Sequence, residues 1–110
     1  MVLKSIEPKN LGGMDYSIYK FILEPFYKRN KATEYRINIY QNVFDENIII
    51  FDIAYEHYII KIVSASDYLE LSIADIVNNK TYNKITLSYR EDFCFATMKK
   101  LIDLEIQTIL

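Results

Sequence analysis

The chain has 110 residues, 51% of them hydrophobic and 25% charged, with a formal net charge of -2. This length is enough for one domain with one core, and the balance of apolar and charged residues excludes wholesale disorder. The negative charge argues against direct nucleic-acid binding, which needs clustered lysine and arginine to displace counterions. A basic protein partner suits the chain better, because complementary charge speeds encounter.

Cysteine content and hydropathy exclude further classes of protein. Cys94 is the single cysteine, so an intrachain disulfide framework and a thiolate metal site are excluded, and a reducing cytosol is favoured. Segment 1–10 lacks the apolar run of a secretory signal, and no stretch reaches the roughly 18 apolar residues of a membrane helix. We therefore expect a cytoplasmic protein without a membrane partner.

The N-terminal part predicts an extension followed by a helix. Residues 1–13 end in two glycines that form a flexible joint, and from Met14 the apolar positions recur with helical spacing. We predict a helix over 14–30, with Asp15 as a candidate N-cap. Because Pro25 cannot donate a backbone hydrogen bond, this helix should kink or start again at the proline. The alternative is a strand in the first half of the segment.

Five further segments between residues 34 and 90 are predicted to be β-strands. They alternate apolar and polar side chains, or are rich in β-branched residues, and turn-forming residues separate them. Consecutive strands with short turns predict an antiparallel meander over 34–90. The strands are expected at 35–40, 48–54, 58–63, 68–73 and 85–90.

A second helix is predicted over 92–109, because Asp92 is a candidate N-cap and one stripe of the segment is apolar. Both helices should pack on the apolar face of the sheet and bury one core. The fold class is therefore α+β: a five-stranded antiparallel meander sheet with an N-terminal and a C-terminal helix packed on one face. We expect residues 1–110 to form a single domain.

The turn positions predict which residues lie opposite each other. Because a slip of one residue would move every side chain to the other face, the pairings sort the sheet into an apolar face and a mixed face. The expected pairs are Arg36–Asp52, Phe51–Ile62, Asp52–Lys61, Ile62–Leu69, Lys61–Glu70, Ile73–Ile85 and Tyr68–Arg90.

The mixed face should carry a transverse row of charges of alternating sign, Arg36, Asp52, Lys61 and Glu70. Opposite charges directly across strands contribute about 0.2–1 kcal/mol per pair. The row is surrounded by more apolar surface than a fully solvated sheet face usually shows. We therefore expect the N-terminal segment, a second copy or a partner to cover it. The surrounding residues are Tyr40, Ile48, Ile50, Ala54, Ile59, Val63 and Tyr68.

The catalytic arrangements that the sequence suggests are weak. His57 beside Glu56 resembles a general base with an orienting carboxylate, but a solvated turn histidine is favoured, because adjacent strand residues point to opposite faces. Asp52 and Glu70 form a carboxylate pair on paper, yet Lys61 is expected between them and should keep both ionised. The serines lack a nucleophile-elbow motif. We therefore predict no catalytic residue, no metal ligand and no cofactor.

Tyrosine is enriched at protein interfaces, and the chain has 10 tyrosines, although compositional bias is an equally good explanation. Tyr40, Tyr55, Tyr58 and Tyr68 are expected on the mixed face or at the turn around residues 56–57, and Tyr58 has the alternative of capping the core. The candidate partner-binding residues are Arg36, Tyr40, Asp52, Tyr55, Glu56, His57, Lys61, Tyr68, Glu70 and Arg90.

The hypothesis for function is a non-enzymatic protein-binding module, and its most concrete form is an immunity protein that neutralises a basic bacterial toxin or nuclease. The chain would act as a monomer or a homodimer. One alternative is a dimer that resembles a secretion chaperone. Another is an enzyme or small-ligand-binding domain with a pocket between sheet and helices, for which Tyr35, Tyr58 and Tyr89 are the polar candidates.

Overall fold

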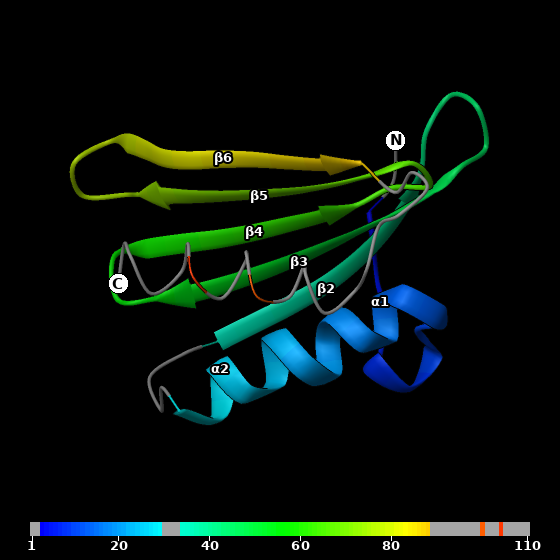
Figure 1. The fold of residues 1–110 in the computed structure, drawn as a ribbon, viewed down its shortest axis with the longest axis horizontal. Coiled ribbons are helices and arrows are strands. Elements are labelled where there is room, and N and C mark those ends of the chain that lie inside the picture. Colours follow the sequence, from blue (N-terminus) through cyan, green and yellow to red (C-terminus); the bar gives the residue numbers. More distant parts are fainter. Residues whose placement is uncertain (1–2, 30–33, 89–99, 101–103, 105–110) are drawn as a thin grey trace.

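The alternating segments of the sequence form an antiparallel sheet with a helical segment on its apolar face (Figure 1). The computed structural model describes residues 3–29 and 34–88, together with Lys100 and Leu104. The order of the strands in the sheet is their order in the chain. The strands are β1 (Lys4–Ser5), β2 (Glu34–Gln41), β3 (Asn47–Tyr55), β4 (Tyr58–Ser64), β5 (Tyr68–Asp75) and β6 (Lys80–Ser88).

The first strand, β1, was not predicted. Lys4 lies opposite Ile39 and Ser5 opposite Asn38, and the Ile6 N–H then donates to a β2 carbonyl at 2.9 Å. The predicted count of five strands is therefore wrong, since the described sheet has six. A two-residue edge strand is too short to show an alternating pattern. The N-terminal extension thus becomes part of the sheet, and Ile6 also packs against the core.

One continuous helical segment connects β1 to β2 after a 3-10 turn, η1 (Pro8–Asn10). It consists of α1 (Gly13–Ile18), the π-helical turn η2 (Tyr19–Leu23) and α2 (Glu24–Arg29). The Glu24 N–H donates to the Tyr19 carbonyl, which is the wider spacing of a π-turn. Pro25, which has no backbone N–H to donate, follows this turn directly as the second residue of α2. The break expected at the proline is a change of helix type, and the strand alternative is wrong.

Asp15 does not cap this helix. The N-cap position is Gly12, which makes no side-chain hydrogen bond to the helix. The Asp15 carboxylate instead accepts a hydrogen bond from the Ser64 hydroxyl at the end of β4, at 2.6 Å. Burial raises the pKa of Asp15, and the hydrogen bond from Ser64 opposes that shift. Asp15, predicted as an N-cap, therefore links the helix to the sheet through a hydrogen bond.

The core lies between the helical segment and one face of the sheet. The helix contributes apolar side chains at helical spacing, and the strands contribute every second residue, as the periods of the two structures require. Phe51 at the centre of β3 is completely buried. The buried core residues are Leu11, Ile18, Ile22, Leu23, Phe26, Ile37, Ile49, Phe51, Ile53, Ile60, Ile62, Leu69, Leu71 and Ile73.

The predicted register is confirmed over β2, β3 and β4. Arg36 lies opposite Asp52, Phe51 opposite Ile62, and Asp52 opposite Lys61. The two turn positions that produced these pairs, between β2 and β3 and between β3 and β4, were therefore correct.

The register of β5 and β6 differs from the prediction. Ile62 lies opposite Leu71 and Lys61 opposite Ser72, because the reversal is centred on Ser66 and Asp67, one residue later than predicted. The β5–β6 reversal is centred between Val77 and Asn78, earlier than predicted, and an irregularity between Ser72 and Ile73 changes the register by one residue. The predicted Ile73–Ile85 pair is therefore not formed, and Ile85 lies opposite Leu71. Tyr68 lies opposite Ser88. The shift between β4 and β5 is two residues, which leaves the assignment of their faces intact.

The predicted C-terminal helix over 92–109 lies outside the described residues, except for Lys100 and Leu104, whose backbone is helical. Arg90 and Tyr89 also lie outside the described residues, and so does the predicted cap Asp92. The structure therefore describes one helical segment on the sheet, the N-terminal one.

Candidate functional site

The mixed face of the sheet brings together six of the ten candidate partner-binding residues. They come from alternate positions of β2 to β5, on the side away from the helical segment, because their neighbours in each strand form the core. The apolar residues between them are partly shielded: Ile48 is buried, and Ile50, Ile59 and Val63 are half-buried. The six residues are Arg36, Tyr40, Asp52, Lys61, Tyr68 and Glu70.

The charge row was predicted to contain four residues, and in the structure it contains three. Arg36, Asp52 and Lys61 lie side by side on β2, β3 and β4. Glu70 lies opposite Val63, and Ser72 takes the position next to Lys61 that the prediction gave to Glu70. The row therefore carries two cations around one carboxylate.

Asp52 is the member of this row whose hydrogen-bonding capacity is not satisfied. Its Oδ1 atom is buried and has no hydrogen-bond partner in the described part of the chain. Burial raises the pKa of Asp52, and the charges of Lys61 and Arg36 only partly oppose that shift. The expectation that Lys61 would prevent a raised pKa is therefore wrong, because desolvation of the carboxylate outweighs the nearby cations.

A hollow of about 420 Å³ lies over the charge row. Residues of the neighbouring strands β2, β3 and β4 line it, so the hollow extends across three strands. Arg36 and Lys61 are exposed there, while Asp52 lies deeper. The residues that line the hollow are Glu34, Tyr35, Arg36, Asp52, Ala54, Ile59 and Lys61.

The other end of the mixed face is acidic around Tyr68. Burial raises the pKa of Tyr68, and the negative charges of Glu70, Asp67 and Glu46 act in the same direction. A second hollow of about 560 Å³ lies at the same end of the sheet, but all of its lining residues except Tyr40 occupy core-side positions of their strands. They are Lys4, Ile39, Tyr40, Gln41 and Asn47. The mixed face therefore has charges of both signs at its centre and acidic residues around Tyr68.

Tyr55 does not belong to the mixed face. Its ring packs edge-on against Phe26, with the ring centroids 5.7 Å apart, and it joins the core side of the sheet. Tyr58 also packs against the core, as its alternative position predicted, and its ring lies 4.2 Å from the His57 ring. Glu56 is exposed in the turn with a φ of 53°. These tyrosines therefore stabilise the fold.

His57 faces a carboxylate that sequence reasoning missed. Its Nε2 lies 3.9 Å from Asp75 Oδ2, and Asp75 is buried. Asn78 donates to Asp75 from its side chain at 2.7 Å and from its backbone at 3.1 Å, and these bonds hold the pKa of Asp75 below its usual value. The His57 side chain is 38% exposed, so the prediction of a solvated histidine holds only in part. The Asp-x-x-Asn spacing at the end of a strand was the signal for this turn.

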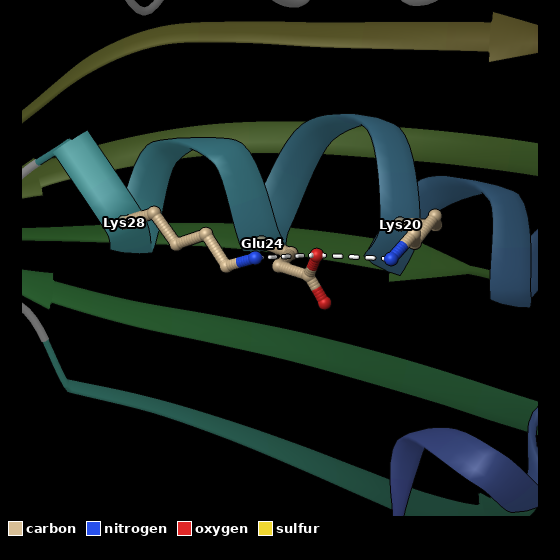
Figure 2. Close-up of polar contacts among 3 residues, drawn as sticks. All are labelled: Lys20, Glu24 and Lys28. Atoms are coloured by element: carbon tan, nitrogen blue, oxygen red, sulfur yellow. Dashed lines mark hydrogen bonds and ion pairs between the residues drawn. The ribbon is translucent and has the colours of Figure 1, made fainter.

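The helical segment has its own closed polar network, shown in Figure 2. Lys20 and Lys28 both reach Oε1 of Glu24, at 3.1 and 3.2 Å. Hydrogen bonds from Lys20, Tyr19 and Lys28 lower the pKa of Glu24 to about 2. Lys28, in the last turn of α2, is therefore already paired within the chain.

Tyr35, one of the polar candidates for a pocket between sheet and helix, belongs to a cluster of aromatic rings. Tyr35 packs against Tyr19 and Tyr27, with ring centroids 6.1 and 5.0 Å apart. In the part of the chain that the structure describes, no group of three acidic, histidine or cysteine side chains is placed to hold a metal ion. No described helix has the length and apolar character needed to cross a membrane.

Comparisons with models of protein families, with curated proteins and with solved structures find no match to this chain. The geometry of the mixed face is therefore the basis for a functional proposal.

Proposed function

We propose that this chain is a protein-binding module that contacts its partner through the mixed face, and that it acts as an immunity protein against a basic bacterial toxin or nuclease. The observation that carries the proposal is the charge row under the hollow. Asp52 keeps a buried acceptor without a donor, beside two exposed cations and a half-buried apolar surface.

The chemistry of this surface suits a protein partner. An unpaired buried acceptor is unfavourable by about 1–3 kcal/mol, and a donor from a partner that reorders the row would recover part of that free energy. Arginine and tyrosine beside a desolvated centre are typical of the residues that dominate binding energy at interfaces. Arg36, directly opposite Asp52, occupies such a position on β2, and Tyr40 lies four residues further along the same face.

Two features support this proposal over its alternatives. The rings of Tyr19, Tyr27 and Tyr35 occupy the space beside the helix, which weighs against a ligand pocket between helix and sheet. The acidic end of the mixed face, around Tyr68, favours a basic partner over a second acidic copy of the chain.

The test is binding by charge-reversed variants. The partner is first isolated by affinity capture from native cells, and its affinity is then measured by calorimetry. We expect Lys61→Glu to weaken binding by about tenfold or more despite the basic partner, because it removes the cation opposite Asp52 and places a second carboxylate beside it, which disrupts the row that the partner contacts. Lys9→Glu is the matched control, since Lys9 is exposed in η1 and lies outside the row. Equal affinities for both variants, with unchanged circular dichroism, would remove the mixed face from the proposal.

A further inference from the structure

The hairpin between β2 and β3 presents two apolar side chains at its tip. Val43 is 90% exposed and Phe44 is 79% exposed. Turn positions are normally occupied by glycine, proline, asparagine, aspartate or serine, each for a backbone reason. Valine and phenylalanine have no such backbone preference for turns. At these exposures neither side chain contributes appreciably to the core. Figure 1 shows this loop projecting beyond the end of the sheet.

The tip is held in one conformation by its own hydrogen bonds. The Asn42 Oδ1 accepts the Phe44 N–H at 2.8 Å and the Glu46 N–H at 3.1 Å. The Asn42 N–H donates to the Glu46 carbonyl at 3.0 Å, and the Asp45 N–H donates to the Asn42 carbonyl at 3.1 Å. Because the backbone is ordered before binding, a partner that takes up these side chains loses less conformational entropy.

The charge around the tip selects the kind of surface it fits. Asp45 and Glu46 are exposed beside Phe44, Asp67 is exposed in the neighbouring β4–β5 turn, and residues 42–46 contain no lysine or arginine. Anionic lipid surfaces attract basic segments, so an acidic rim disfavours a membrane. A second copy would bring like charges together, which is also unfavourable. A basic protein surface with an apolar pocket satisfies both the charge and the apolar side chains.

We infer that residues 42–46 form an apolar plug that inserts Phe44, with Val43 beside it, into a basic-rimmed pocket on the partner protein. This inference rests on the proposed function and names the chemistry of the partner. The plug is continuous with the mixed face, because Glu46 lies near Tyr68 and the base of the same hairpin carries Tyr40. The contact surface therefore runs from the charge row to the tip.

A second apolar tip provides the matched control. Ile76 is 61% exposed and Val77 is 75% exposed in the β5–β6 turn, at the opposite end of the sheet from the plug (Figure 1). In that turn Asp75 points inward to Asn78, and the exposed charge that follows is Lys80. This tip has similar hydrophobicity and fewer exposed acidic neighbours, with Glu56 in the adjoining β3–β4 turn, so substitutions there test whether apolar exposure alone is responsible.

The experiment has two steps. A photoreactive phenylalanine derivative in place of Val43 is cross-linked in native cells, and the captured protein and its cross-linked peptide are identified by mass spectrometry. The purified partner is then titrated with Phe44→Ser and with Ile76→Ser in the otherwise complete chain. We expect Phe44→Ser to weaken binding by about tenfold or more, as for an interface hot spot, and Ile76→Ser to change it by less than about twofold.

Several results would overturn the plug. They are a cross-link to a second copy of the chain, co-sedimentation of the chain with phosphatidylserine vesicles that Phe44→Ser abolishes, an acidic partner, or equal affinities for the two serine variants. Loss of affinity in Lys61→Glu but not in Phe44→Ser removes the plug and leaves the proposed function standing. Unchanged affinity in both variants, or the absence of any captured protein, removes both proposals.

Discussion

The two faces of this sheet are made by the same strands and treat their side chains differently. On the core face, Phe51, Ile53 and Ile62 are at most 1% exposed and pack against the helical segment. On the mixed face, Asp52 alternates with them along β3 and keeps an acceptor without a partner. The comparison shows that the side chains of the core face are buried within the chain, whereas the mixed face keeps a hydrogen-bond acceptor without a partner in the described part of the chain.

The largest effect should come from removing the central core side chain. Phe51→Ala is expected to lower the free energy of unfolding by about 3–5 kcal/mol, because it creates a cavity under the helix. Ile50→Ala, one residue away on the mixed face, is the control and should lower it by much less. Urea unfolding followed by circular dichroism measures both values. Similar losses in the two variants would contradict the contrast between the faces.

A smaller loss is expected where the helix is tied to the core side of the sheet. Ser64→Ala removes the 2.6 Å hydrogen bond to the Asp15 carboxylate, which is already desolvated. We expect a loss of about 1–3 kcal/mol in the free energy of unfolding. Ser66→Ala, in the exposed β4–β5 turn, is the control. If both serine variants unfold at the same urea concentration, the tie has no energetic role.

Asp52→Asn should stabilise the free chain while weakening its interface. A raised pKa means that the folded state prefers the neutral carboxyl, so the contribution of Asp52 to stability falls as the pH rises from its unfolded pKa through its folded pKa. The asparagine variant should therefore gain up to about 1 kcal/mol over the native chain at pH 7 and nothing at about pH 3. Urea titrations at the two pH values measure this difference, and a variant less stable at pH 7 would reverse the sign.

The smallest effect is expected at Glu24, on the solvent side of the helix (Figure 2). Its pKa is lowered to about 2, so its stabilising contribution is complete above the unfolded pKa and is lost as the pH falls through about 2. Glu24→Gln should reduce the loss of stability between these pH values. Added salt should mimic the substitution, because the pairs with Lys20 and Lys28 are exposed. An acid unfolding profile unchanged by the substitution would contradict this prediction.

The accuracy of the sequence predictions follows the physics of each element. The alternation around Phe51 and Asp52 assigned the two faces of β3 correctly, because a period of two is a local property of strands. Tyr55 was predicted on the mixed face or at the turn, but it packs on the core side. It is the last residue of β3, so the alternation of apolar and polar residues continues on one side of it only. The contact of Asp75 with Asn78 was missed although its spacing is local, whereas its contact with His57 depends on the packing of two different turns.

The sequence by itself determined the class of this protein's fold, the two faces of its sheet and the register of β2, β3 and β4, since hydrophobic periodicity and turn residues are encoded over a few neighbouring positions. Tertiary structure alone decided the addition of β1, the π-turn before Pro25 and the shifted register at Ser72 and Ile73. It also decided that Asp52 would be desolvated beyond what Lys61 offsets. Each of these depends on how distant segments pack, and packing sets the burial and the pairing that no local pattern contains.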